Sequence, residues 1–352
     1  MLVELLVSTG IVLGLLGVVA TLLDPSGGVL AVQTHAVDLH QRQRAALAEL
    51  HRDLLAAGSG PHPGMLGTVA HVMPAVAPVL RGEGATGAVG ADRLSVVYAR
   101  SNASGARLAA PLPGAGGSVT VTQDTACRSV PCGLTRDGGG LAIVYDDTGR
   151  AGLYRITGRS GATVELIHVG GGPAGGTFAV GSRIAPVRVR GYYHDAGRQQ
   201  IRVHNGAGAD RPAIEGVARF GVRYYGADQP APPPSTTLPA GPLVVPPGSP
   251  APVPVALMAP CLAAAVAAGA PPTSRAAPID LAELADGPWC GAGAALDVDQ
   301  FRIRRIRVEV TLRVVDDAWR RAPPGTLGPR RSTGIRDVGA TLDVTPRSLT
   351  SW

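Results

Sequence analysis

The N-terminal part of the chain shows two successive helical patterns of apolar residues. Residues 1–23 are almost entirely apolar and carry a single charge, that of Glu4. As a helix this segment would extend ~34 Å, at about 1.5 Å per residue, and the hydrocarbon core of a bilayer is about 30 Å thick. Residues 24–28 contain a proline and two adjacent glycines, which interrupt helices. We therefore predict a transmembrane helix over residues 1–23, followed by a hinge.

The segment after this hinge has the pattern of an amphipathic helix. Apolar residues recur at spacings of three and four, which is typical of a helix packed on a core. The mostly apolar stripe consists of Val32, Ala36, Leu39, Gln43, Ala46, Leu50 and Leu54. Gly58 and Pro61 end the pattern. Residues 24–58 are therefore predicted to form the hinge and a second helical half that can lie on a globular domain.

Most of the remaining chain has the pattern of β-strands separated by glycine-containing turns. The predicted short strands are residues 94–99, 118–123, 141–145, 153–157, 163–169, 188–193 and 200–204. Two longer runs, 217–225 and 305–315, alternate apolar and polar residues, as in an antiparallel sheet with one face on a core. The apolar stripe of the helix is the natural partner for that face. We therefore predict an α+β fold, in which a long N-terminal helix packs on an antiparallel β-sheet.

A change in composition divides the β-rich part. We predict a globular domain over residues 59–227, a Pro/Ala-rich insert over 228–290, and C-terminal strands over 291–352 that complete the domain. Proline-rich segments cannot pair inside a sheet, so the insert should lie on the surface. A disordered linker is the alternative interpretation of residues 228–278.

The cysteines are even in number and fit no zinc-binding spacing. They are Cys127, Cys132, Cys261 and Cys290. We predict two disulfides, Cys127–Cys132 and Cys261–Cys290, in an oxidising compartment. Reduced thiols are the alternative.

Composition and motifs give no indication of catalysis. All 32 basic residues are arginines, so chemistry that requires a lysine is excluded. Residues 170–175 match a dinucleotide-binding pattern, but a predicted strand follows where a helix is required. Asp146 and Asp147 fit a turn better than a calcium site, because no further ligand set accompanies them. We predict that the protein is not an enzyme and binds no metal or cofactor.

The N-terminal motif resembles that of a known superfamily. Leu2, Val3, Glu4 and Leu5, followed by an apolar helix, resemble the start of type IV pilins and pseudopilins. The resemblance implies that these residues act in subunit assembly, with Glu4 pairing with the N-terminal amine of a neighbouring subunit. It also implies removal of a leader by prepilin peptidase and methylation of the new N-terminus. Because no leader precedes Met1, we expect that the start codon lies further upstream.

Later segments resemble PilW-type minor pilins more loosely. These are residues 41–58, 297–315 and 335–349. The resemblance implies a structural minor pilin that helps to initiate or cap a type IV pilus. Its implied partners are other pilin subunits, the inner-membrane assembly platform and the inner membrane itself, through residues 1–23. The implied location is the inner membrane with a periplasmic globular domain, and then the pilus or pseudopilus at the cell surface.

Three other functions share part of this pattern. A minor pseudopilin of a type II secretion system would have the same N-terminal helix. A pilin for DNA uptake would use positive charge, and the formal net charge of +6 permits but does not require such a partner. The densest basic run consists of Arg302, Arg304, Arg305 and Arg307. A solvated strand face is the alternative for this run, because no aromatic residues are interleaved. A plain membrane-anchored protein, with or without an enzymatic domain, is the third function.

Overall fold

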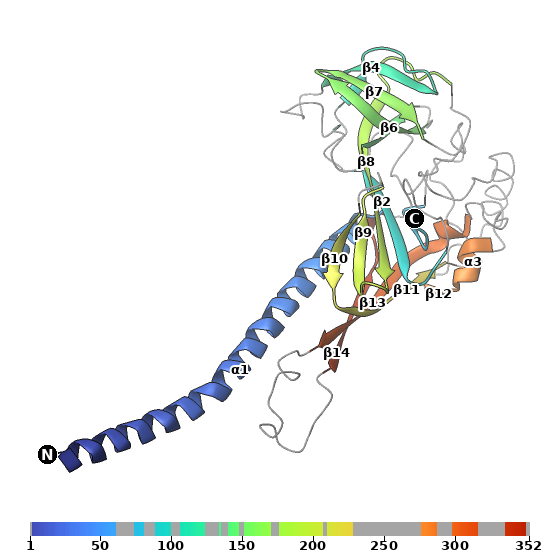
Figure 1. Ribbon diagram of the computed structural model, residues 1–352. Helices are drawn as coiled ribbons and strands as arrows, with labels where there is room; N and C mark the ends of the chain where they lie inside the picture. Colours follow the sequence, from blue (N-terminus) through green and yellow to red (C-terminus); the bar gives the residue numbers. More distant parts are fainter. Residues whose placement is uncertain are drawn as a thin grey trace.

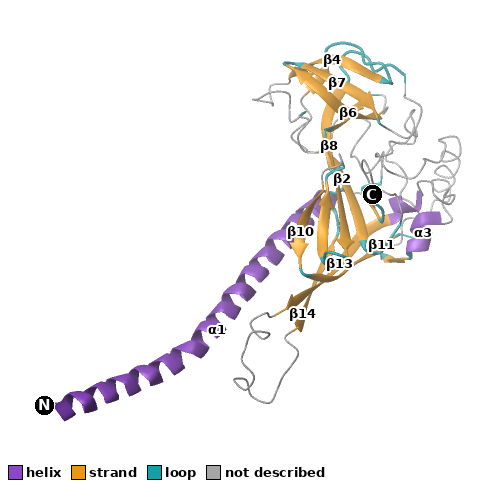
Figure 2. Ribbon diagram, in the orientation of Figure 1, coloured by secondary structure: helices purple, strands orange, loops and turns teal. Residues whose placement is uncertain are grey.

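The computed structural model describes residues 2–60, 74–80, 89–99, 106–123, 134, 140–147, 151–169, 176–206, 210–227, 276–286, 298–315 and 335–349. Within these ranges the chain forms a long N-terminal helix and two antiparallel sheets (Figures 1 and 2). Short helical turns, α3 (Leu281–Asp286), η5 (Val298–Arg302) and η6 (Arg347–Leu349), flank the second sheet.

Helix α1 (Leu2–Ala56) is continuous and extends away from the sheets in Figure 1. The hinge predicted at residues 24–28 is wrong, because the backbone stays helical there. Helix propagation is cooperative, so long helical flanks can carry a helix through an unfavourable segment. The predicted end is confirmed: Gly58 has a φ of 72°, the left-handed conformation that commonly ends helices.

The first sheet contains ten strands. They are β1 (Val76–Ala77), β2 (Arg93–Ala99), β3 (Ala106–Leu108), β4 (Gly116–Gln123), β5 (Leu141–Tyr145), β6 (Ala151–Ser160), β7 (Thr163–His168), β8 (Arg183–Asp195), β9 (Gln200–His204) and β10 (Asp210–Glu215). Six of them close into a ring in the order β3-β4-β7-β6-β5-β8, because β8 pairs with both β5 and β3. We call this unit the six-stranded ring. Its interior is filled by apolar side chains such as Leu108, Val144, Tyr154 and Phe178.

Strand β8 belongs to both parts of the first sheet. Its first half pairs with β3 and β5 in the ring, and its second half pairs with β2 and β9. β10 then pairs with β9 at the edge. The ring and the lower part of the molecule are thus joined by one continuous strand (Figure 1).

The second sheet contains four strands in the order β12-β11-β13-β14. They are β11 (Val217–Gly226), β12 (Ala277–Ile279), β13 (Ile303–Val315) and β14 (Ile335–Val344). Only Gly216, with a φ of 70°, separates β10 from β11, and there the chain passes from one sheet to the other. The predicted alternation is confirmed, because Phe220, Val222 and Tyr224 are buried on β11, as are Ile306, Val308, Val310 and Leu312 on β13.

The main apolar core lies between the second sheet, the lower part of the first sheet and the end of α1. Val96, Tyr192 and Ile201 of the first sheet share one cluster with the buried face of the second sheet. From the helix, Leu50 and Leu54 enter the same cluster. Each sheet therefore covers the apolar face of the other, and the helix closes the core only with its last turns.

The predicted α+β arrangement, a long helix packed on a sheet, is wrong. The structure is mostly β-sheet, and the helix does not cover a sheet along its length. The apolar side chains of residues 3–19 are exposed instead of packed. The physical reason is that two sheets with apolar faces bury each other, which leaves little core for the helix to cover.

The predicted transmembrane helix over residues 1–23, and with it the location in an inner membrane, is also contradicted. Within the part of the chain that the structure describes, no helix has both the length and the apolar character that crossing a membrane requires.

The predicted disulfides find no support. All four cysteines lie outside the described residues, and there is no disulfide among the residues that are described. Most of the predicted insert over 228–290 also lies outside them. Its C-terminal part, however, contains β12, which pairs with β11, and α3. The strands on either side of the insert, β11 and β13, pair directly with each other.

One glycine of β11 is fixed by a close backbone approach. A Cβ atom on Gly226 would clash with the carbonyl oxygen of Arg302, whereas a Cβ on Gly221 of the same strand would meet nothing within 4 Å. We expect Gly226→Ala to lower the free energy of unfolding by about 2 kcal/mol or more, since the clash is with backbone. Gly221→Ala, the matched control, should change it by less than ~0.5 kcal/mol. Urea denaturation of both variants tests this, and equal midpoints would contradict the observed approach.

Candidate functional site

The most unusual surface of the molecule is the first part of α1. From Val3, which is 75% exposed, to Val19, which is 49% exposed, its large apolar side chains face solvent. They are Val3, Leu5, Leu6, Val7, Ile11, Val12, Leu13, Leu15, Leu16, Val18 and Val19. We call residues 3–19 the projecting helix. Because contiguous apolar surface of this kind marks interaction sites, it is the leading candidate for function.

The two hydroxyls of the projecting helix bond to its own backbone. The hydroxyl of Thr9 donates to the carbonyl oxygen of Leu5 at 2.8 Å, and that of Ser8 donates to the same carbonyl at 3.1 Å. Cβ atoms added to Gly10, Gly14 or Gly17 would meet nothing within 4 Å, so the backbone is bare at these positions. The helix therefore offers an apolar surface with small residues at which another chain can approach closely.

The residues predicted to act in subunit assembly lie at the free end of this helix. Leu2, Val3, Glu4 and Leu5 form its first turn. Val3 and Leu5 are exposed, and Glu4 is exposed as well. A carboxylate in the first turn is favourable, because the N-terminus of a helix carries partial positive charge.

At the other end, α1 is fastened to the first sheet by a buried carboxylate. Asp53 is 6% exposed and accepts hydrogen bonds from the hydroxyls of Tyr98 on β2, at 2.9 Å, and Tyr192 on β8, at 2.7 Å. The guanidinium Nε of Arg190 lies 4.0 Å from the same carboxylate. We call Asp53, Tyr98, Tyr192 and Arg190 the helix anchor.

The two tyrosines of the helix anchor are held as proton donors. Burial raises the pKa of the Tyr192 hydroxyl, and the negative charge of Asp53 raises it further. The same two causes, in the same order, raise the pKa of Tyr98. Both hydroxyls thus keep their protons across the physiological range and can donate to Asp53. On the surface, Arg211 of β10 adds an ion pair to Glu49 of the helix at 2.6 Å.

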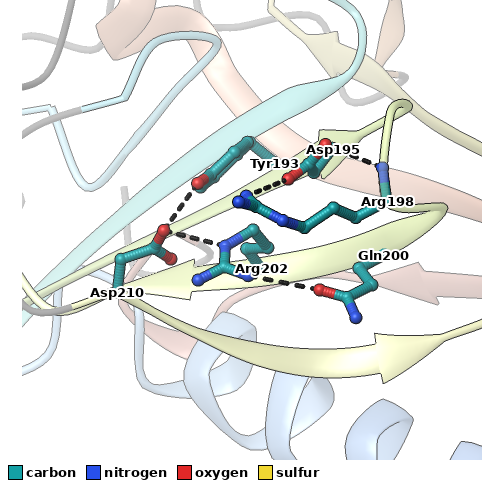
Figure 3. A network of polar contacts seen from close by, with 6 residues as sticks. All are labelled: Tyr193, Asp195, Arg198, Gln200, Arg202 and Asp210. Atoms are coloured by element: carbon teal, nitrogen blue, oxygen red, sulfur yellow. Dashed lines mark hydrogen bonds and ion pairs between the residues drawn. The ribbon is translucent and has the colours of Figure 1, made fainter.

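A second polar network braces the three strands beside the helix, as Figure 3 shows. Asp210 of β10 accepts from the hydroxyl of Tyr193 at 2.7 Å and from Nε of Arg202 at 2.8 Å. Arg202 also donates to Gln200 at 3.2 Å. In the turn between β8 and β9, Arg198 pairs with Asp195 at 3.0 Å.

The interactions within this network shift the pKa values of its own members. Hydrogen bonds from Arg198, first from its backbone N–H, lower the pKa of Asp195. Burial, followed by the hydrogen bond to Asp210, raises the pKa of Tyr193. The groups thus stabilise one another's ionisation states, which is what a structural brace between strands requires.

The arginines of the predicted anionic-partner surface do not share one surface. Arg302 is buried and pairs with Asp299 at 2.5 Å and with Glu283 at 3.1 Å. Arg304 donates to backbone carbonyl oxygens, and burial lowers its pKa to about 10.

The other two arginines of the run, Arg305 and Arg307, lie on the outer face of β13, opposite the buried Ile306 and Val308. The guanidinium of Arg305 stacks 4.2 Å from the centre of the Tyr225 ring, and Arg307 pairs with Asp343 at 2.8 Å. Each of the four arginines is therefore already engaged within the chain. The anionic-partner surface stays a prediction that this arrangement does not favour.

The residues of the helix anchor were not identified from the sequence. Asp53 follows His51 and Arg52, so it is indistinguishable from the solvated face of an amphipathic helix. Tyr98 and Tyr192 lie in predicted strands, where an aromatic residue is ordinary core. Only the pairing of β2 with β8, which places both hydroxyls beside the helix, reveals the site.

The described residues contain no group of His, Cys, Asp and Glu side chains that could hold a metal ion. Comparison with known proteins found no matching family, no matching curated protein and no matching solved structure.

Proposed function

We propose that the chain is a structural subunit of a type IV pilin-like filament, of the minor pilin kind, which helps to initiate or cap assembly. The observation that carries this proposal is the projecting helix. Apart from Glu4, Ser8 and Thr9 it carries only apolar side chains and glycines, and it is exposed along residues 3–19, while the described residues beyond it form a core of their own.

Burial of this helix is strongly favoured energetically. Fully burying one Val, Leu or Ile side chain contributes about 1.5–3 kcal/mol. A helix that is apolar all round is typical of one surrounded on every side. We infer that helices of the same character, from neighbouring subunits, surround it in a bundle. The glycines of the projecting helix would allow close packing in such a bundle.

The helix anchor supports this role. Several contacts fix the last turns of α1 to three strands of the first sheet, β2, β8 and β10, so the helix direction is set relative to the globular part. A subunit that is built into a bundle through its helix needs such a joint, because the joint determines where its globular part is displayed.

Site-specific photo-crosslinking in the producing cells tests the proposal. A photoreactive amino acid at Leu13, 69% exposed on the projecting helix, should form adducts with a second chain. The same residue at Val180, 60% exposed but distant from the helix, is the control. Mass spectrometry should map the Leu13 adducts to an apolar N-terminal helix of another subunit.

The outcomes of this experiment are distinct. Adducts of Leu13 with such a helix would support a filament subunit, and the identity of the partner would separate a pilus from a secretion pseudopilus. If Leu13 and Val180 gave the same adducts, or if Leu13 reacted only with partners that lack an apolar helix, the proposal would be refuted.

A further inference from the structure

The outer face of the six-stranded ring carries two arginines and a tyrosine in one row across three neighbouring strands. Arg107 of β3 pairs directly with Arg183 of β8, and Arg183 pairs on its other side with Tyr145 of β5. Their chain neighbours Ala106 and Ile184 are buried inside the ring. Because side chains alternate along a strand, the row lies on the opposite, outer face. Side chains directly opposite each other have Cβ atoms about 4.5–5.5 Å apart.

The two arginines bring like charges together, and no carboxylate of the described residues pairs with either of them. Like charges directly opposite in a sheet are destabilising. Among the described residues, neither guanidinium forms an ion pair, and Arg107 donates only to the backbone carbonyl oxygen of Gly181, at 3.3 Å. The Nε atom of Arg183 is buried and has no hydrogen-bond partner in the part of the chain that the structure describes. This concentration of positive charge with unused donors is the first sign of a missing anion.

The tyrosine provides a second, independent sign. Tyr145 is 1% exposed, and its hydroxyl has no hydrogen-bond partner among the described residues. Burial raises the pKa of this hydroxyl to about 12, while the charges of Arg183 and Arg107 act in the opposite direction. The nearby carboxylate of Asp147 has the smallest of the four effects. A buried hydroxyl without a partner is costly, so its position beside two guanidiniums calls for an acceptor.

We propose that Arg107, Arg183 and the hydroxyl of Tyr145 form a binding site for a small oxyanion of the phosphate or carboxylate class. Guanidinium groups present planar sets of donors that match two oxygens of such an anion. A protonated phenol adds one further donor. The bound anion would relieve the repulsion between the arginines and satisfy the tyrosine. This inference does not depend on the proposed filament role.

Thermal unfolding of the full chain, kept dispersed in mild detergent, tests the site. The probes are inorganic phosphate and acetate, each compared with sodium chloride at equal ionic strength. At about 100 times the dissociation constant, a one-site ligand should raise the melting temperature by roughly 5 °C. The shift should saturate, and isothermal titration should give one anion per chain. Phosphate alone or acetate alone would identify the class, and either would support the site.

Three variants make the test specific. Arg183→Gln should abolish the anion-dependent shift, and Arg219→Gln, which removes an equal charge from the exposed face of β11, should retain it. Tyr145→Phe should weaken the shift without lowering the melting temperature in chloride, because its hydroxyl has no partner to lose. The site is refuted if neither anion shifts the native chain beyond chloride. It is equally refuted if Arg183→Gln and Tyr145→Phe both respond like the native chain.

Discussion

Replacement of Arg302 by alanine is expected to lower the free energy of unfolding by about 3–5 kcal/mol, the usual effect of breaking a buried ion pair from one side. Arg302 is 8% exposed, and its guanidinium faces Asp299, whose side chain is fully buried. Its Nε also donates to the carbonyl oxygen of Ala227 at 2.9 Å, and the backbone N–H of Ala227 donates back to the carbonyl oxygen of Arg302 at 3.1 Å. The side chain thus clamps the end of β11 to the start of β13.

Urea denaturation, followed by circular dichroism, measures the effect, and Arg307→Ala is the matched control. Arg307 pairs with Asp343 on the solvent-facing side of the same strand, so its loss should cost no more than about 1 kcal/mol. The double variant Arg302→Met with Asp299→Leu should recover most of the stability, because no buried charge is left behind. Equal midpoints for Arg302→Ala and Arg307→Ala would show that the clamp has no role in stability.

Loss of the helix anchor is expected to have the next largest effect. Asp53→Ala leaves the hydroxyls of Tyr98 and Tyr192 buried beside Arg190 with no acceptor. Each unsatisfied buried donor costs about 1–3 kcal/mol, so a total loss of about 3 kcal/mol is expected. The last turns of α1 should also detach more readily, which limited proteolysis near residue 52 can detect.

Glu49→Ala is the control for this variant. It removes the exposed ion pair between the helix and Arg211 and should cost less than about 1 kcal/mol. Tyr98→Phe and Tyr192→Phe each remove one hydrogen-bond donor. Their losses in free energy of unfolding should lie between those of Asp53→Ala and Glu49→Ala. If Asp53→Ala were no more sensitive to protease or urea than Glu49→Ala, the carboxylate would not be what fastens the helix.

Local patterns in the sequence predicted the strands well. The runs 94–99, 141–145 and 200–204 coincide closely with β2, β5 and β9. The alternation in 305–315 also identified the buried side chains of β13, because apolar and polar residues alternate along a strand with one solvent-exposed face. These features depend only on residues near one another in the chain.

The predicted arrangement of layers, a long helix on one sheet, was wrong because the layers of a fold depend on which strands pair. Strand β8 pairs with β9, which follows it in the chain, but also with β2, β3 and β5, which are remote in sequence, and no local pattern encodes those three partners. From the sequence, the strands of the closed ring and of the second sheet were therefore assigned to one sheet, whose apolar face would pack against a helix. The same limit hid Asp53, whose partners lie 45 and 139 residues away along the chain. It also made Arg302 resemble a solvated residue, although Asp299 lies only one turn before it.

The continuity of β8 has a mechanical consequence. This strand contributes Ile184 to the interior of the ring, Val187 to the apolar cluster on its outer side, and Tyr192 to the core beside the helix. A tension applied between the ring and the helix would therefore travel along a covalent backbone. It would load the hydrogen bonds to β2 and β9 together, in shear, instead of opening them one after another. We expect the two parts of the molecule to yield at a single force under such a pull, as one mechanical element.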